Sequence, residues 1–127
     1  MRLLLDTHVL IAVARQDTDT ADANIAASVK SPENLLFVSA ASIWEIAIKY
    51  RLGKLDPGIP LENLGQYLKT TGFTLLDVTD RHAVEAVVPA PATRDPFDRM
   101  LLAQCSVEGM RLVTLDRAIA DHPLAWR

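Results

Sequence analysis

The chain of 127 residues has few of the residues that form disulfides or bind zinc: it contains one cysteine, Cys105, and three histidines. A single cysteine cannot form a disulfide within the chain, and the scattered Cys and His residues have no spacing typical of a zinc site. No apolar run approaches the roughly 18 residues that a membrane-spanning helix needs, and no secretory leader is recognisable. We therefore expect a soluble, cytoplasmic protein with no membrane association. Any metal it binds must be held by oxygen.

The sequence also lacks an excess of positive charge, because 13 Lys and Arg face 16 Asp and Glu, a net charge of -3. This balance argues mildly against a protein that grips nucleic acid by bulk electrostatics alone. Half of the residues are apolar, which is enough for one sizeable core. We expect a single domain over residues 1–127.

Short apolar runs alternate along the chain with segments of helical periodicity. Strands are expected at residues 3–5, 35–39, 73–78 and 111–115. Helices are expected at 8–15, 20–29, from about 42 to Gly53, and at 61–72, 79–88 and 96–109. Strands that alternate with helices predict a mostly parallel sheet with helices on both faces.

Four separated acids fall where such a sheet binds its ligands. Asp6 follows the first strand and Asp116 the last, and ligands bind beyond the carboxyl ends of parallel strands. Glu45 and Asp98 lie in the first turns of helices, so all four side chains can converge on one rim. Carboxylates packed together repel one another, and a hard divalent cation such as Mg²⁺ or Mn²⁺ relieves that repulsion.

Each acid also has a structural explanation. Aspartate is a favoured helix N-cap, and acids are stabilised in the first turn of a helix. Ser42 and Glu45 have the S-x-x-E spacing of a capping box, and Lys49 is placed to form an ion pair with Glu45.

Two aspartates compete for the start of one helix. Asp95 precedes Pro96, which suits the first helical position, so Asp95 is assigned to the cap, with Arg99 as an ion-pair partner. Asp98 is then free for chemistry.

Four motifs together carry a resemblance to a known family: "LLLDTHVLI", "SAASIWEIAIKYRLGKL", "RDPFDRMLLAQ" and "LVTLD". Their order and spacing resemble PIN-domain proteins, and among these the VapC toxins of bacterial toxin–antitoxin pairs. The resemblance extends from Arg2 to about Asp121.

The resemblance implies a three-layer α/β/α sandwich with four or five strands and an Mg²⁺-dependent endoribonuclease that hydrolyses RNA phosphodiester bonds. It further implies a homodimer and a small antitoxin protein that blocks the site. It assigns catalysis and metal binding to Asp6, Glu45, Asp98 and Asp116, with Thr114 and, more weakly, Thr7 as supporting hydroxyls.

A divalent ion can activate water, act as a Lewis acid and orient a phosphate. Our hypothesis is that three aspartates bind one or two ions, while Glu45 either ligates a second ion or orients the attacking water. Basic residues near the acids in sequence could contact RNA phosphates, although such residues are more often simply solvated. They are Lys49, Arg51, Lys54, Arg94 and Arg99.

Two alternatives remain open. The chain could be a catalytically inactive PIN-fold module that binds RNA or protein. It could also be an Mg²⁺-dependent phosphoryl-transfer domain, but receiver domains need adjacent acids after the first strand and a lysine after the last, and the related phosphatases need D-x-D. Here the first strand is followed by Asp-Thr-His and the last by Thr-Leu-Asp, so neither pattern is met.

Overall fold

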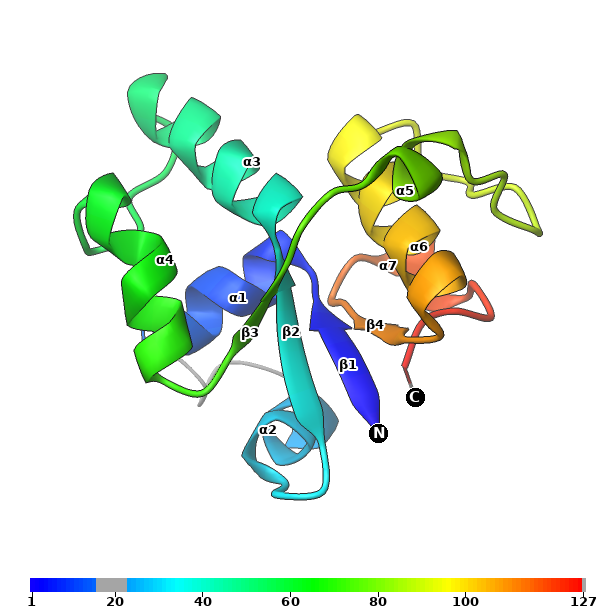
Figure 1. The fold of residues 1–127 in the computed structure, drawn as a ribbon, viewed down its shortest axis with the longest axis horizontal. Helices are drawn as coiled ribbons and strands as arrows, with labels where there is room; N and C mark the ends of the chain where they lie inside the picture. The colour runs from blue at the N-terminus through cyan, green and yellow to red at the C-terminus, as the bar shows by residue number, and fades with distance from the viewer. Residues whose placement is uncertain (16–22, 127) are drawn as a thin grey trace.

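Seven helices and four strands make up the part of the chain that the structure describes. A computed structural model describes residues 1–15 and 23–126. Figure 1 shows their arrangement. In chain order the elements are β1 (Arg2–Leu5), α1 (Thr7–Ala14), α2 (Ala23–Lys30), β2 (Leu35–Ser39), α3 (Ala40–Arg51), α4 (Leu61–Thr70), β3 (Thr74–Leu76), α5 (Asp80–Val84), α6 (Pro96–Glu108), β4 (Arg111–Val113) and α7 (Arg117–Ala120).

The four strands form one sheet in the order β3-β2-β1-β4, and every pairing is parallel. Leu4 at the centre of β1 pairs with Phe37 of β2 and Leu112 of β4. The carboxyl ends of all four strands therefore lie at one edge. β1 runs into α1 and β2 runs into α3 at this edge (Figure 1).

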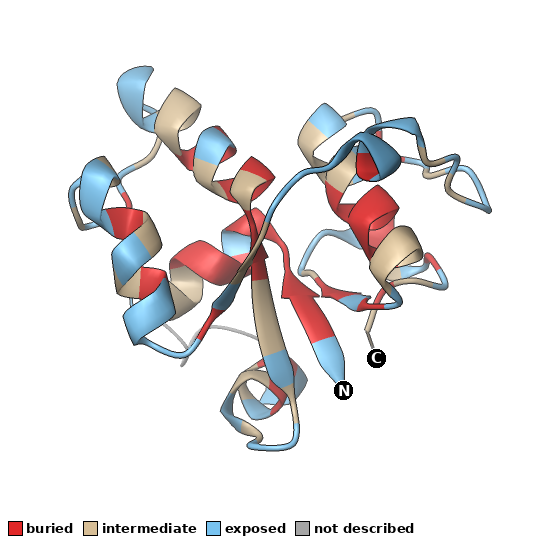
Figure 2. Cartoon of the chain, viewed as in Figure 1, coloured by how far each residue is buried: buried red, intermediate tan, exposed pale blue. Residues whose placement is uncertain are grey.

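Helices cover both faces of the sheet, as expected. Successive side chains of β1 point to opposite faces. Leu3 and Leu5 pack in a cluster with apolar residues of α1 to α4, whereas Leu4 packs in a second cluster with residues of α6 and α7. Figure 2 shows β1 buried from Leu3 onward. Burial on both faces explains why the strand is uniformly apolar rather than alternating.

Three predicted helix boundaries are confirmed. Asp95 caps α6, with Oδ1 accepting from the Phe97 amide at 2.8 Å. Thr79 caps α5, and Gly109 ends α6 in the left-handed conformation at φ 69°. Glycine takes this conformation without the steric cost that a side chain brings.

The predicted capping box of α3 is wrong. The helix begins at Ala40, and its cap is Ser39, whose hydroxyl accepts from the Ala41 amide at 3.0 Å. Ser42 is buried inside the first turn and faces Thr7 at 3.0 Å. The S-x-x-E spacing is typical of a capping box, but here the Ser42 hydroxyl bonds to Thr7, which is distant in the chain.

Three elements are shorter than predicted. β3 starts at Thr74 because the Phe73 amide donates to Leu68 at the end of α4. β4 stops at Val113, and α5 at Val84 rather than residue 88. Val87 and Val88 follow α5 and precede Pro89. The helical conformation is disfavoured for a residue that precedes proline, and β-branched residues have a lower helix propensity. The predicted start of the second helix at residue 20 lies outside the described residues.

No helix within residues 1–15 and 23–126 is long and apolar enough to cross a membrane.

Candidate active site

Asp6 lies at the end of β1 and caps α1. Its Oδ1 accepts from the amides of His8 at 2.7 Å and Val9 at 3.5 Å, and its Oδ2 accepts from the Thr114 hydroxyl at 2.6 Å. The residue is 2% exposed. The positive end of α1 and the Thr114 hydroxyl thus hold this buried carboxylate in place.

Thr114 links the first and last acids. While its hydroxyl donates to Asp6, its oxygen accepts from the Asp116 amide at 3.0 Å. Asp116 is exposed and caps α7, with Oδ1 accepting from the Ala118 amide at 2.9 Å. The predicted supporting role of Thr114 thus has a definite geometry.

Glu45 projects from the second turn of α3 and is 3% exposed. Its Oε1 accepts from the Thr7 hydroxyl at 2.6 Å, and its Oε2 accepts from Lys49 Nζ at 2.5 Å. The predicted ion pair with Lys49 is confirmed. Thr7 has a single hydroxyl proton, which it gives to the carboxylate, so the Ser42 hydroxyl is the donor in the Thr7–Ser42 pair.

Asp98 lies half-buried in the first turn of α6. Its Oδ2 accepts from the Thr93 hydroxyl at 3.3 Å. The pKa of Asp98 is raised to about 6, first by burial and then by repulsion from the carboxylates of Asp95, Asp6, Asp116 and Glu45. The other three predicted acids therefore lie within electrostatic reach of Asp98, which makes this rim strongly negative.

The donor set suits a hard divalent cation, because carboxylate and hydroxyl oxygens are the ligands that Mg²⁺ and Mn²⁺ prefer. In residues 1–15 and 23–126, however, no three Asp, Glu, His or Cys side chains are close enough together to enclose an ion. Each acid is instead held by its own protein donors: Asp6 by α1 and Thr114, Glu45 by Thr7 and Lys49, Asp98 by Thr93, and Asp116 by α7.

The predicted phosphate-contacting cations occupy two places. Arg51 and Lys54 line an open hollow of about 670 Å³ with Arg15 and Tyr50, next to Lys49 on α3. Arg94 is exposed in the loop before α6.

The predicted ion pair between Arg99 and Asp95 is wrong. Its guanidinium donates to the carbonyl oxygens of Thr93 at 2.8 Å and Pro91 at 3.4 Å. Among the ion pairs of the described residues there is none between Arg99 and Asp95. The carbonyl groups of the proline-rich loop are not hydrogen-bonded within a helix or strand, so they can accept hydrogen bonds from the Arg99 guanidinium.

The sequence did not indicate three contacts around the site: Thr93 with Asp98, Ser42 with Thr7, and Arg15 in the hollow with Arg51 and Lys54. A signal existed for Thr93, because Thr93-x-Asp95 repeats the spacing of Thr114-x-Asp116. In both cases the threonine oxygen accepts from the amide two residues on, while its hydroxyl donates to another acid of the rim.

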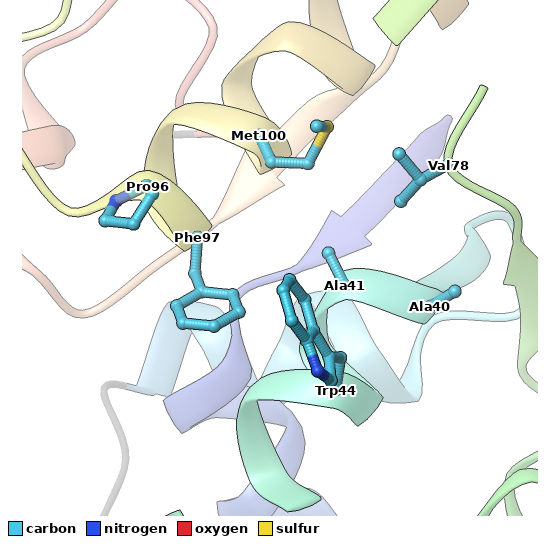
Figure 3. Close-up of a pocket in the computed structure, with 7 residues that line it drawn as sticks. All are labelled: Ala40, Ala41, Trp44, Val78, Pro96, Phe97 and Met100. Carbon is cyan, nitrogen blue, oxygen red and sulfur yellow. The ribbon is translucent and has the colours of Figure 1, made fainter. Parts of the chain in front are cut away.

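An apolar hollow adjoins the acids between α3 and α6. Its cavity measures about 400 Å³, and Figure 3 shows Trp44 of α3 and Phe97 of α6 beside each other in its lining. The two rings meet edge to face at 5.6 Å, and each directly precedes an acid in the chain, Glu45 or Asp98. Trp44 is 63% exposed although it is large and apolar.

Three further residues have structural places: Cys105, His8 and Trp126. Cys105 is fully buried in the core, and burial raises the pKa of its thiol to about 12. His8 is exposed, with Nδ1 3.8 Å from Asp6 Oδ1. Trp126 packs half-buried against the first core cluster.

A parallel sheet between two helical layers, with acids gathered at the carboxyl edge of its strands, defines an α/β domain with an acidic site. The PIN domain profile matches residues 3–123, so the chain belongs to the PIN-domain family.

Two relatives from Mycobacterium tuberculosis are named as ribonucleases. Ribonuclease VapC22 is 29% identical over 124 residues, which cover 94% of this chain and 91% of that protein. Ribonuclease VapC16 is 59% identical over 57 residues, or 44% of this chain and 40% of that protein.

Two solved structures share the fold. VapBC2 from Rickettsia felis, bound to a DNA fragment from its promoter, has a TM-score of 0.64 at 13% identity, covering 98% of this chain and 96% of that one. A toxin–antitoxin complex from Klebsiella pneumoniae has a TM-score of 0.59 at 15% identity, with the same coverage.

Proposed function

We propose that the chain is an Mg²⁺- or Mn²⁺-dependent endoribonuclease, the toxin of a VapBC-type toxin–antitoxin pair. The observation that carries the proposal is the placement of the acids at one rim: Thr114 bonds to both Asp6 and Asp116, and these two acids and Glu45 lie near enough to Asp98 to raise its pKa. A divalent cation would relieve this repulsion. Membership of the PIN-domain family and two relatives named as ribonucleases support it.

Asp6, Asp98 and Asp116 would hold the ion in this proposal. When bound, a divalent ion activates water for attack on a phosphodiester and offsets charge on the phosphate. The chain positions the ligands: Thr114 fixes Asp6, Thr93 fixes Asp98 and Thr7 fixes Glu45. The exposed cations Arg51, Lys54 and Arg94 are proposed to contact RNA phosphates outside the reacting group.

Two aspartates of one helix give the test a matched control. In Asp95→Asn the cap of α6 is preserved, because asparagine caps a helix as well as aspartate does. In Asp98→Asn a proposed ligand loses its charge. Both variants and the wild type are incubated with a pool of cellular RNAs, with Mn²⁺ or Mg²⁺ and with chelator.

The wild type and Asp95→Asn should cleave RNA only with the metal, with rates within a few-fold of each other. Asp98→Asn should lose at least about 100-fold, the scale of removing one electrostatic contributor to a transition state. Cleavage that survives chelation, or equal rates for Asp95→Asn and Asp98→Asn, would refute the proposal. RNA binding without cleavage would favour the inactive binding module instead.

We also propose a small antitoxin partner, a homodimer and a cytoplasmic location. The fold is shared with proteins solved as toxin–antitoxin complexes, which supports the first of these. An adjacent small open reading frame should encode the antitoxin, and its product should suppress the RNA cleavage when the two proteins are copurified. For the homodimer, the apolar hollow between α3 and α6 is the proposed contact with the second copy.

A further inference from the structure

A cationic hollow lies where α1 and α3 end, away from the acidic rim. Both helices begin at the carboxyl edge of the sheet (Figure 1). Arg15 is the C-cap of α1 and Arg51 ends α3, and both line the hollow together with Lys54. Among the described residues that line it, the only acid is Asp56. Basic residues are ordinary at the end of a single helix, but here cations from two helices and a loop converge on one space.

The local structure holds two of these cations at the end of α3. Gly53 has a φ of 71°, a conformation that glycine takes without steric cost, and it turns the chain so that the Lys54 amide donates to the Lys49 carbonyl at 2.9 Å. The Arg15 guanidinium donates to the carbonyl oxygen of Asp56 in the loop that follows. The backbone of Lys54 and the side chain of Arg15 are therefore fixed beside the end of the helix.

The hollow has the charge and size of an anion-binding site. Arg51 and Lys54 are exposed, and neither takes part in the salt bridges of the described residues. The volume of about 670 Å³ lies within the range of about 300–1,000 Å³ that is usual for ligand sites. Three cations against one carboxylate make the hollow attractive to a phosphate group.

Tyr50 connects the cationic hollow to a second hollow. Its side chain is 47% exposed although it is large and aromatic. It lines both the cationic hollow and a space of about 460 Å³, which Asp56 and residues 58–62 also line. Three of these, Ile59, Pro60 and Leu61, are apolar. An exposed aromatic ring beside a cationic groove is the combination that binds single-stranded nucleic acid, because bases stack on the ring while cations bind the phosphates.

We propose that the two hollows form a nucleotide subsite for single-stranded RNA outside the reacting group: Arg51 and Lys54 bind a phosphate in the cationic hollow, and Tyr50 stacks on a base in the second hollow. The inference rests on the RNA substrate of the proposed function. Arg51 lies six residues after Glu45 on the same helix, about 9 Å along its axis, so one strand can occupy the acidic rim and the subsite together. Binding in the subsite needs no metal.

The test measures affinity in chelator, where binding is separated from cleavage. Fluorescence anisotropy gives the dissociation constants of three labelled probes: a single-stranded RNA oligonucleotide, a ribose–phosphate chain of the same length without bases, and a poly-glutamate peptide. The variants are Tyr50→Leu, which removes the ring, Tyr50→Phe, which keeps it, Arg51→Gln, and Lys69→Gln, a matched control at an exposed lysine in the last turn of α4. The wild type is also irradiated with RNA that contains iodouridine, and the crosslinked residue is identified by mass spectrometry.

The wild type should bind the RNA more tightly than the chain without bases, and iodouridine should crosslink to Tyr50. Tyr50→Leu should weaken RNA binding at least about fivefold, the scale of losing one stacked base, and leave binding of the base-free chain unchanged. Arg51→Gln should weaken binding of both, and the slope of log affinity against log salt should fall by about 0.7, the share of one phosphate contact in a single strand. Tyr50→Phe and Lys69→Gln should bind RNA as the wild type does.

Equal RNA affinity of Tyr50→Leu and the wild type would overturn the inference, as would a crosslink confined to other residues. Poly-glutamate that binds as tightly as RNA and depends equally on Arg51 would make the hollow a site for acidic peptides instead. These outcomes leave the proposed function intact, because metal-dependent cleavage is measured separately. Conversely, RNA that binds through Tyr50 but is not cleaved with metal would refute the proposed function alone. If Tyr50→Leu fails to fold, the crosslink and the wild-type affinities for RNA and the base-free chain decide.

Discussion

At the scale of single residues, Asp98 is the acid of the site whose pKa is raised by burial and by neighbouring carboxylates. Its folded-state pKa of about 6 lies above the ordinary value of 3.8, first through burial and then through neighbouring carboxylates. A carboxyl with a raised pKa stabilises the fold while it is protonated. That contribution is complete below about pH 4 and is lost as the pH rises through 6.

Replacing Asp98 with asparagine should therefore stabilise the metal-free protein at neutral pH. Asparagine stays uncharged at every pH, so the difference between variant and wild type should be absent near pH 4 and grow up to pH 7. We expect about 1 kcal/mol there, because the carboxyl is half-buried and solvent screens it. Urea denaturation in chelator across this range measures the difference. A variant less stable than wild type at pH 7 would contradict the raised pKa.

The positions of the acids could be predicted from sequence, but their donors could not. Asp6 and Asp116 follow strands, and the carboxyl ends of parallel strands share an edge, so their approach to each other follows from topology. Ser42 was assigned to a cap because its local spacing fits one. Its actual partner, Thr7, is 35 residues away in the chain, and no local pattern encodes that contact.

At the scale of elements, a buried histidine joins α5 to α6. His82 Nδ1 accepts from the Thr79 amide at 3.0 Å, so its proton lies on Nε2, which donates to Glu108 Oε2 at 2.7 Å. The sequence predicted a helix beginning at residue 79 but not this link, because Glu108 is 26 residues further along than His82.

Removing the acceptor in Glu108→Ala should leave the His82 Nε2–H buried without a partner. We expect a loss of about 1–3 kcal/mol in the free energy of unfolding, the cost of an unsatisfied buried donor. Glu108→Gln keeps an oxygen acceptor and should retain most of the stability, and Glu33→Ala controls for losing an exposed glutamate. Urea denaturation measures all three. If Glu108→Ala is as stable as Glu33→Ala, His82 does not tie the two helices together.

At the scale of the whole molecule, the exposed apolar hollow between α3 and α6 is the proposed contact between two copies of the chain. We expect light scattering to give twice the chain mass of 14.0 kDa. Trp44→Ser should return the mass to that of a single chain, because it removes the largest exposed apolar side chain of the hollow. Leu52→Ser is the matched control, since Leu52 is 62% exposed just beyond the other end of α3. A Trp44→Ser protein that stays dimeric would place the contact elsewhere.

The acidic rim also connects the two ends of the fold. Thr114 donates to Asp6 across 108 residues, and β4 lies beside β1 in the sheet. A divalent ion held by Asp6, Asp98 and Asp116 would bind the folded chain only, because the unfolded chain does not bring these acids together. Mn²⁺ at 100 times its dissociation constant should then raise the free energy of unfolding by about 2.7 kcal/mol. Guanidinium denaturation with Mn²⁺ and with chelator, at equal ionic strength, measures this gain. In Asp6→Asn the gain should largely disappear, and an undiminished gain in that variant would show that the ion binds elsewhere on the protein.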